Sequence, residues 1–232
     1  MPRPEAANAD TGGTGRKLLS IAHELGLTLS AVEVDALLGY LALLQRWNAT
    51  YNLTAIRDPA QMLTQHLADC LAAIGPLRRH LGTLGSAQVL DVGSGGGFPG
   101  VLIAALNPGV HVTCVDTVGK KAAFVRQVAA ELGLKNLAAE HARVESLTAP
   151  KFDAIVSRAF ASLANFVRLT SSLLAPGGAW MAMKGKEPTD EMAVLPGDME
   201  VFHVEHLSVP GLAAERCLVW IRRRIDAKPP SI

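Results

Sequence analysis

The stretch that decides the fold is Val89-Leu90-Asp91-Val92-Gly93-Ser94-Gly95-Gly96-Gly97-Phe98-Pro99-Gly100. An apolar run that suits a buried strand leads into a turn with almost no side chains, and a helical pattern follows. Glycine lets the backbone adopt positive φ and approach a ligand closely, and a loop before a helix presents free N–H groups. We therefore predict a strand–turn–helix unit that binds a small molecule.

Short apolar runs alternate with helix-length segments from Ala87 onward. This alternation predicts an α/β fold, a doubly wound and mostly parallel sheet of Rossmann-like type. Two late runs, near Glu200–Val209 and Glu215–Arg224, have no helix between them, so we expect an antiparallel pair that closes the sheet edge. The other predicted strands are Gln88–Val92, His111–Asp116, Leu137–His141, Phe152–Ser157 and Ala179–Met183, with helices at about 98–106, 119–132 and 162–175.

A helical pattern precedes the sheet, from Arg16 to about Leu84. Ser30 and Glu33 form a capping-box signature, and the helix that follows is expected to end near Trp47-Asn48. A loop over Asn48–Asp58 then leads to Pro59 at a first helical position. We divide the chain into a disordered tail (1–15), a helical extension packing on the core (16–86), the domain of the glycine turn (87–226) and a C-terminal tail (227–232).

Composition limits the function classes. Of 232 residues, 49% are hydrophobic, and the formal net charge is only +1, so any basic surface for nucleic acid must be local. Three scattered cysteines argue against a disulfide framework and a structural zinc site, and no metal is expected. No signal peptide and no apolar run of about 20 residues is visible, so we expect a cytoplasmic chain without a membrane segment.

Two ligands suit the glycine turn. Residues 95–100 match G-x-G-x-x-G and Asp116 follows at dinucleotide-like spacing, which favours a nucleotide cofactor. However, the Asp91 carboxylate suits the cationic amino-acid end of S-adenosylmethionine and would repel a pyrophosphate. The glycines also begin early, at Gly93, and later segments match methyltransferases. We therefore favour S-adenosylmethionine over a dinucleotide or a purely structural turn.

Further candidate residues lie at the carboxyl ends of the predicted strands. Asp116 is placed to bind the two ribose hydroxyls, unless it is only a surface acid that opens a helix. Arg143, Arg158 and Lys184 are candidates for positioning a phosphate or a base edge. A surface salt bridge is the alternative for Arg158.

Together these motifs resemble the bacterial glucose-inhibited division protein B family, also called RsmG. The resemblance runs from about Leu44 to Arg224. It implies transfer of a methyl group from S-adenosylmethionine to N7 of the guanine at nucleotide 527 of 16S rRNA, and donor contacts by Gly93, Phe98, Val144, Glu145 and Arg158, with Asp116 as the ribose acid. Asp91 and Gly95 of the glycine turn complete our set of candidate donor-binding residues. The pieces that carry the resemblance are Arg46-Trp47-Asn48, Tyr51-Asn52-Leu53-Thr54, Arg57-Asp58-Pro59, His66 with Asp69, residues 91–100, Gly119-Lys120-Lys121 with Phe124, Arg143-Val144-Glu145, Ser157-Arg158-Ala159 and Lys184-Gly185.

Guanine N7 carries an unprotonated lone pair, so no essential general base is expected, and Arg158, Arg143 and Lys184 would act by positioning. The implied partner is 16S rRNA in the small ribosomal subunit, and we expect a monomer. Asn48, Asn52 and His66 are candidates to reach over the pocket, although a histidine on an apolar helix face is commonly a core residue. Rival hypotheses are an oxidoreductase, an RNA-binding assembly factor and a methyltransferase acting on a small molecule or protein. The candidate RNA-contacting residues are Lys120, Lys121, Arg126, Lys184, Lys186 and Arg222–Arg224.

Overall fold

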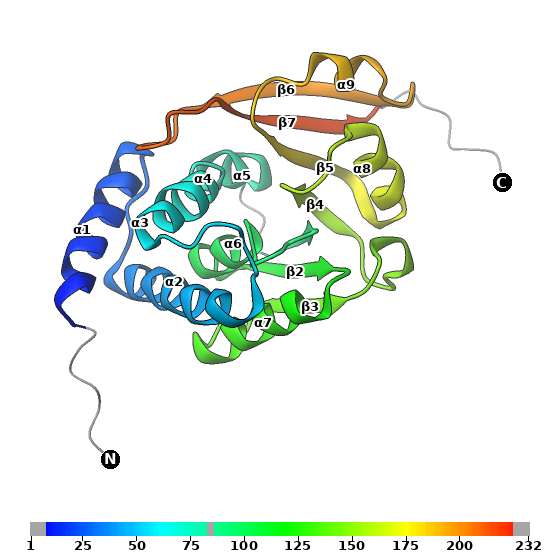
Figure 1. The fold of residues 1–232 in the computed structure, drawn as a ribbon. Helices are drawn as coiled ribbons and strands as arrows, with labels where there is room; N and C mark the ends of the chain where they lie inside the picture. The colour runs from blue at the N-terminus through cyan, green and yellow to red at the C-terminus, as the bar shows by residue number, and fades with distance from the viewer. Residues whose placement is uncertain (1–7, 83–85, 225–232) are drawn as a thin grey trace.

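A seven-stranded sheet with the order β3-β2-β1-β4-β5-β7-β6 forms the centre of the computed structural model (Figure 1), which describes residues 8–82 and 86–224. The first five strands are parallel, and β7 runs antiparallel to both β5 and β6. The strands are β1 (Ala87–Val92), β2 (Val110–Asp116), β3 (Leu137–His141), β4 (Phe152–Ser157), β5 (Leu174–Lys184), β6 (Met199–Leu207) and β7 (Arg216–Arg223).

These strands confirm the predicted doubly wound sheet and the predicted antiparallel pair. Within this pair β7 lies between β5 and β6, so β6 is the edge strand and Arg222 and Arg223 belong to an interior strand.

Two hydrophobic cores lie on opposite faces of the sheet, because successive side chains of a strand point to opposite sides. In β1, Val89 packs into the core beneath the helical extension, α6 (Gly100–Leu106) and α7 (Gly119–Glu131). Leu90 and Val92 pack into the other core, against α8 (Leu163–Thr170). The short helix α9 (Thr189–Ala193) follows β5.

The helical extension begins with α1 (Asn8–Glu24) and α2 (Ala31–Tyr51). The predicted tail over 1–15 is wrong for residues 8–15, which are helical; Gly15 is buried, and a Cβ there would touch Leu38 of α2. The capping box is confirmed, since the Ser30 N–H donates to Glu33 Oε2 over 2.7 Å and the Glu33 N–H donates to Ser30 Oγ over 3.3 Å. Residues 1–7, 83–85 and 225–232 lie outside the described residues, and the predicted C-terminal tail 227–232 is among them.

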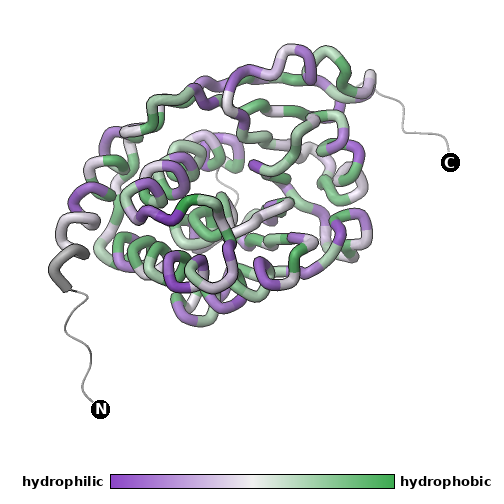
Figure 2. Tube along the Cα trace, viewed as in Figure 1, coloured by the Kyte–Doolittle hydropathy of each residue, from purple (hydrophilic) through white to green (hydrophobic). Residues whose placement is uncertain are grey.

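Helix α2 is one turn longer than predicted. It runs through Asn48 to Tyr51 and ends at Asn52, which adopts a left-handed conformation with φ 49°. Beyond it come α3 (Pro59–Met62), the π-helix η2 (Leu63–Ala68), α4 (Asp69–Leu71) and α5 (Ile74–Leu81). Pro59 is the first residue of α3, as predicted. Figure 2 shows hydrophobic and hydrophilic residues alternating along these helices, as expected of helices with one buried side.

No helix among the described residues is long and apolar enough to cross a membrane.

Candidate functional site

The sheet reverses its strand order between β1 and β4, so the loops leaving these strands diverge and open a crevice. Gly93 follows β1, and Arg158 follows β4. Three adjoining hollows lie at this crevice, and we name each by its position.

The strand-end hollow holds about 400 Å³, and the smaller glycine-turn hollow holds about 170 Å³. Gly93 and Ala159 line both, so these residues form the wall between them. The Arg216 hollow, of about 350 Å³, shares His66 and Arg158 with the glycine-turn hollow. The three spaces therefore form one continuous row across the carboxyl ends of the strands.

Gly93 has no room for a side chain. Its φ is +68°, and a Cβ atom there would lie 2.7 Å from Cβ of Ala159. Gly95 also has positive φ, and its N–H donates to Asp116 Oδ2 over 2.9 Å. The other Asp116 oxygen accepts the N–H of Val118 over 2.8 Å. Asp116 thus fixes the glycine turn while lining the strand-end hollow.

Asp91 lies beneath the turn and is fully buried. Its Oδ2 accepts the N–H of Gly100 over 2.8 Å, at the start of α6, whereas Oδ1 has no partner among the described residues. Burial raises the pKa of this carboxyl to about 8. Asp91 lines none of the three hollows. The structure therefore gives it a supporting position, and its direct contact with a ligand stays a prediction.

Arg158 belongs to a mostly buried ionic cluster in which Asp69 lies between two arginines. Its Nη1 donates to Asp69 Oδ2 over 3.0 Å, and the other Asp69 oxygen accepts from Nε of Arg216 over 2.8 Å. The Arg158 guanidinium also lies 4.8 Å from the centre of the Phe98 ring. The Arg158 ion pair is therefore mostly buried, with 24% of the arginine side chain and 4% of the aspartate side chain exposed, unlike the surface salt bridge considered from the sequence.

His66 packs in the core and also lines the glycine-turn hollow. Its ring stacks on Phe98 with 4.3 Å between centroids, and its Nε2 lies 2.8 Å from Oγ1 of Thr54. Burial, reinforced by the charge of Arg158, lowers the pKa of His66 to about 4. The imidazole is therefore neutral at pH 7.

The remaining predicted site residues divide between the hollows. Arg143, Val144 and Glu145 line the strand-end hollow, and the Arg143 side chain is exposed. Lys184 lines the Arg216 hollow, but its ammonium group donates to the Phe160 carbonyl over 2.9 Å and to Glu191 over 2.8 Å and 2.9 Å. A protein carboxylate thus already neutralises Lys184, so its predicted phosphate contact would need Glu191 to move.

Asn48 and Asn52, which we expected to reach over the pocket, form hydrogen bonds with the loop that follows α2 instead. Asn48 is 3% exposed and holds the loop that follows α2, since its Nδ2 donates to the Ile56 carbonyl and its Oδ1 accepts the Thr54 N–H. Asn52 is exposed and accepts from Arg57. Neither side chain lines the three hollows.

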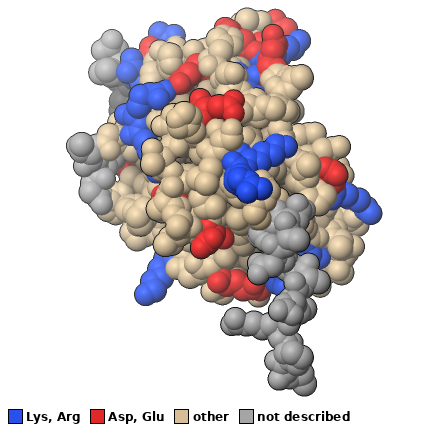
Figure 3. All heavy atoms as spheres, turned by 90° about the vertical axis from the view of Figure 1, so that its left-hand side faces the viewer, with Lys and Arg blue, Asp and Glu red and all other residues tan. Residues whose placement is uncertain are grey.

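Several candidate RNA-contacting residues are engaged with protein groups. Arg126 donates to the Ala139 carbonyl, Arg222 to Glu200 and Arg223 to the Ser171 carbonyl. Figure 3 shows positive and negative side chains interspersed on the face around α1, without a continuous basic field. This arrangement agrees with the near-neutral net charge.

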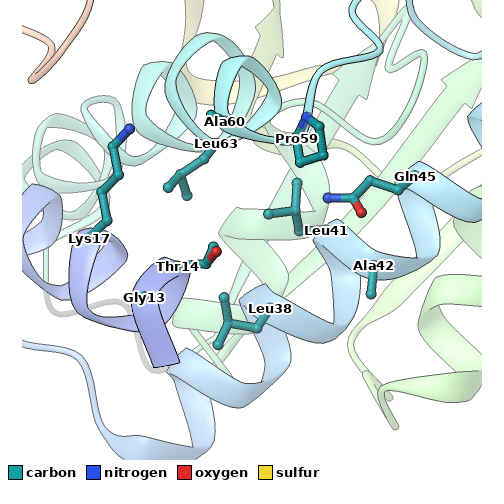
Figure 4. Close-up of a pocket in the computed structure, with 10 residues that line it drawn as sticks. All are labelled: Gly13, Thr14, Lys17, Leu38, Leu41, Ala42, Gln45, Pro59, Ala60 and Leu63. Atoms are coloured by element: carbon teal, nitrogen blue, oxygen red, sulfur yellow. The ribbon is translucent and has the colours of Figure 1, made fainter. Parts of the chain in front are cut away.

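A larger hollow than these three lies elsewhere. It holds about 500 Å³ between α1, α2 and α3 (Figure 4) and contains none of the predicted site residues. Leu38, Leu41 and Leu63 provide much of its wall. Its size alone therefore does not mark it as the functional site. Within the described part of the chain, no cluster of three potential metal ligands is present either.

The strand order, the glycine turn and the crevice at the switch point define the Rossmann-like fold of S-adenosylmethionine-dependent methyltransferases. Solved structures with this fold include TrmN from Thermus thermophilus, with a TM-score of 0.54 and 18% identity, covering 93% of this chain and 79% of that one. A ribosomal protein L11 methylase from Lactobacillus delbrueckii has a TM-score of 0.52 and 20% identity, and the match covers 69% of this chain and 79% of that one. A methyltransferase from Geobacter sulfurreducens in complex with S-adenosyl-L-homocysteine has a TM-score of 0.51 and 13% identity, and the match covers 79% of this chain and 98% of that one.

Sequence comparison narrows the class to one family. The family described as rRNA small subunit methyltransferase G, or GidB, matches residues 33–219. Enzymes of that name from Methylibium petroleiphilum and Leptothrix cholodnii are each 62% identical, covering 88% and 89% of this chain and 91% and 94% of their own lengths. The chain belongs to the rRNA small subunit methyltransferase G family. The resemblance seen in the sequence is thereby confirmed, and the protein is a methyltransferase rather than a dinucleotide-dependent oxidoreductase.

Proposed function

We propose that this chain transfers a methyl group from S-adenosylmethionine to N7 of the guanine at nucleotide 527 of 16S rRNA in the small ribosomal subunit. The observation that carries the proposal is the pair of hollows that meet at Gly93 and Ala159, at the switch point of a sheet with this family's sequence. The strand-end hollow, at about 400 Å³, is within the range of small-molecule pockets. The glycine-turn hollow has less than half that volume and suits the shorter, amino-acid end of the donor.

The lining residues fit the two ends of that donor. Asp116 uses one acceptor site on each oxygen for Gly95 and Val118, and a carboxylate offers about four such sites. It can therefore still accept from two ribose hydroxyls, while Val144 and Glu145 flank the base. Gly93 and Gly95 allow the close backbone approach that the amino-acid end requires.

When bound, S-adenosylmethionine supplies an electrophilic methyl group on a sulfonium. The chain's own task is then to orient the acceptor, because guanine N7 has a free lone pair and needs no base to remove a proton. The methylated base carries positive charge, and two features avoid opposing it. His66 is neutral at pH 7, and the Arg158 guanidinium is held back from the base by its ion pair with Asp69.

The Arg216 hollow is the candidate approach for the RNA, because it adjoins the glycine-turn hollow at His66 and Arg158. We further propose that the enzyme acts as a monomer in the cytoplasm, where ribosomal subunits are found, and that it needs no metal.

A transfer assay tests the proposal. Labelled S-adenosylmethionine is incubated with small ribosomal subunits, or 16S RNA, that lack the modification, and N7 methylation is mapped by strand cleavage. We expect label at a single guanine N7, unaffected by a metal chelator. Label at another atom or nucleotide would refute the assigned acceptor, and binding of S-adenosylmethionine without transfer to any of these RNAs would refute the substrate.

A further inference from the structure

The orientation of one hydroxyl hydrogen beside the glycine-turn hollow follows from the hydrogen bonds around His66. Nη2 of Arg158 lies 3.3 Å from Nδ1 of His66. A guanidinium can only donate, so Nδ1 must be the acceptor. A neutral imidazole carries one N–H, which is then on Nε2.

That Nε2–H donates to Oγ1 of Thr54 over 2.8 Å. The backbone N–H of Ile56 donates to the same oxygen over 3.2 Å. A hydroxyl oxygen has two acceptor sites, and both are used here. The Thr54 hydroxyl can therefore only donate, and its hydrogen has no other acceptor within reach in the described part of the structure.

The loop that carries Thr54 is held in place. Asn48, buried in the last turn of α2, accepts the Thr54 N–H over 2.9 Å and donates to the Ile56 carbonyl over 2.9 Å. His66 is fixed by its stacking on Phe98. Thr54 is thus a preorganised hydrogen-bond donor. Because its side chain is already ordered, the protein loses little conformational freedom when a ligand binds to it.

The glycine-turn hollow, which Thr54 lines, suits an anionic group. Its lining contains no acidic side chain, and Arg158 adds a positive charge. Two N–H groups of Arg158, on Nε and Nη2, have no partner among the described residues. At about 170 Å³ this hollow has less than half the volume of the strand-end hollow, so it suits the short carboxylate-bearing chain of the donor better than the nucleoside.

We infer that the Thr54 hydroxyl, together with Arg158, binds the carboxylate of the methyl donor, with His66 and Asn48 as positioning residues. This inference rests on the proposed function, which places the nucleoside of the donor in the strand-end hollow on the other side of Gly93 and Ala159. The Tyr51-Asn52-Leu53-Thr54 motif and Asn48 thereby acquire a role in donor binding.

Calorimetric titration with two ligands tests the inference. S-adenosylhomocysteine has the carboxylate, whereas 5′-methylthioadenosine lacks the whole amino-acid end. We expect Thr54→Val to weaken the binding of S-adenosylhomocysteine by about tenfold or more, because it removes a hydrogen bond to a charged group. The affinity for methylthioadenosine should stay unchanged. Thr54→Ser keeps the hydroxyl and should bind both ligands as the wild type does.

Each other outcome overturns the inference in a recognisable way. Equal losses for both ligands would make Thr54 a purely structural residue. If Thr54→Val left the affinity for S-adenosylhomocysteine unchanged but raised the KM for RNA, the Thr54 hydroxyl would contact the RNA and not the methyl donor. A wild type that bound neither ligand would refute the proposed function itself. Independently of any variant, ¹⁵N NMR of His66 in the wild type must show the Nε2–H tautomer, and an Nδ1–H tautomer would refute the argument.

Discussion

Replacing Gly93 with alanine tests the wall between the strand-end and glycine-turn hollows. The new side chain meets two costs. A non-glycine residue in the left-handed region, here at φ +68°, costs about 1–2 kcal/mol. The added Cβ would also lie 2.7 Å from that of Ala159, about 1 Å closer than a normal contact between carbon atoms.

The end of β1 and the start of the loop after β4 must then separate. A misplacement near 1 Å at a reaction site can cost about a hundredfold in rate. We therefore expect Gly93→Ala to lose about a hundredfold in turnover and at least about tenfold in affinity for S-adenosylhomocysteine. The methyl-transfer assay measures the turnover and calorimetric titration the affinity, while urea unfolding measures the loss of stability from the two costs.

Gly133 supplies a matched control. Its φ is +66°, and a Cβ added there would meet no atom within 4 Å, so Gly133→Ala should lose about 1–2 kcal/mol of stability but keep its affinity. Ala159→Gly in the Gly93→Ala background removes the overlapping atom and should restore most of the binding. If Gly93→Ala bound like the wild type, or if the double variant recovered nothing, the proposed wall would be wrong.

Three further variants test the surroundings of the site. Tyr40→Phe removes the buried hydrogen bond from α2 to the Gly96 carbonyl; we expect a loss of about 1–3 kcal/mol in urea unfolding, and an unchanged midpoint would contradict it. The folded-state pKa of His66, about 4, lies below its ordinary value, so the wild type should lose stability relative to His66→Gln as pH falls from about 6.5 to about 4, by up to about 1.4 kcal/mol per pH unit. A pH-independent difference between these two proteins would refute the neutral imidazole. The pH dependence of stability at Asp91 has the opposite sign, because burial raises the folded-state pKa of this carboxyl to about 8. The wild type should lose stability relative to Asp91→Asn as pH rises from about 4 to about 8, and parallel unfolding curves would exclude a neutral Asp91.

Local patterns were sufficient for most of the fold. The apolar run 89–92 is buried on both faces of the sheet, so its strand character is visible without knowledge of its neighbours. The boundaries that failed depend on tertiary contacts. Asn48 looks like a helix end because it is polar, but its side chain is buried and bonded to Thr54 and Ile56, so α2 continues past it.

The site was only partly visible for the same reason. Gly93, Asp116 and Val144 follow strand ends, where topology places ligands, and the structure brings them to one hollow. Asp69 and Arg216 were not assigned a role, because nothing in their spacing indicates that both contact one cluster. The alternative of a surface ion pair for Arg158 also failed, since burial of its partner depends on helices distant in the sequence.

The ionic cluster also links the site to the order of protein synthesis. Asp69 and Arg216 are separated by 147 residues, and Arg216 opens β7, which follows the other six described strands in the sequence. The N-terminal helices leave the ribosome first, yet Asp69 acquires its second arginine only when β7 has been translated and inserted beside β5. A nascent or truncated chain that ends before β7 can hold the glycine turn and Arg158 but not this cluster. The finished site thus depends on translation through β7, so a product that stops before this strand would lack the complete cluster.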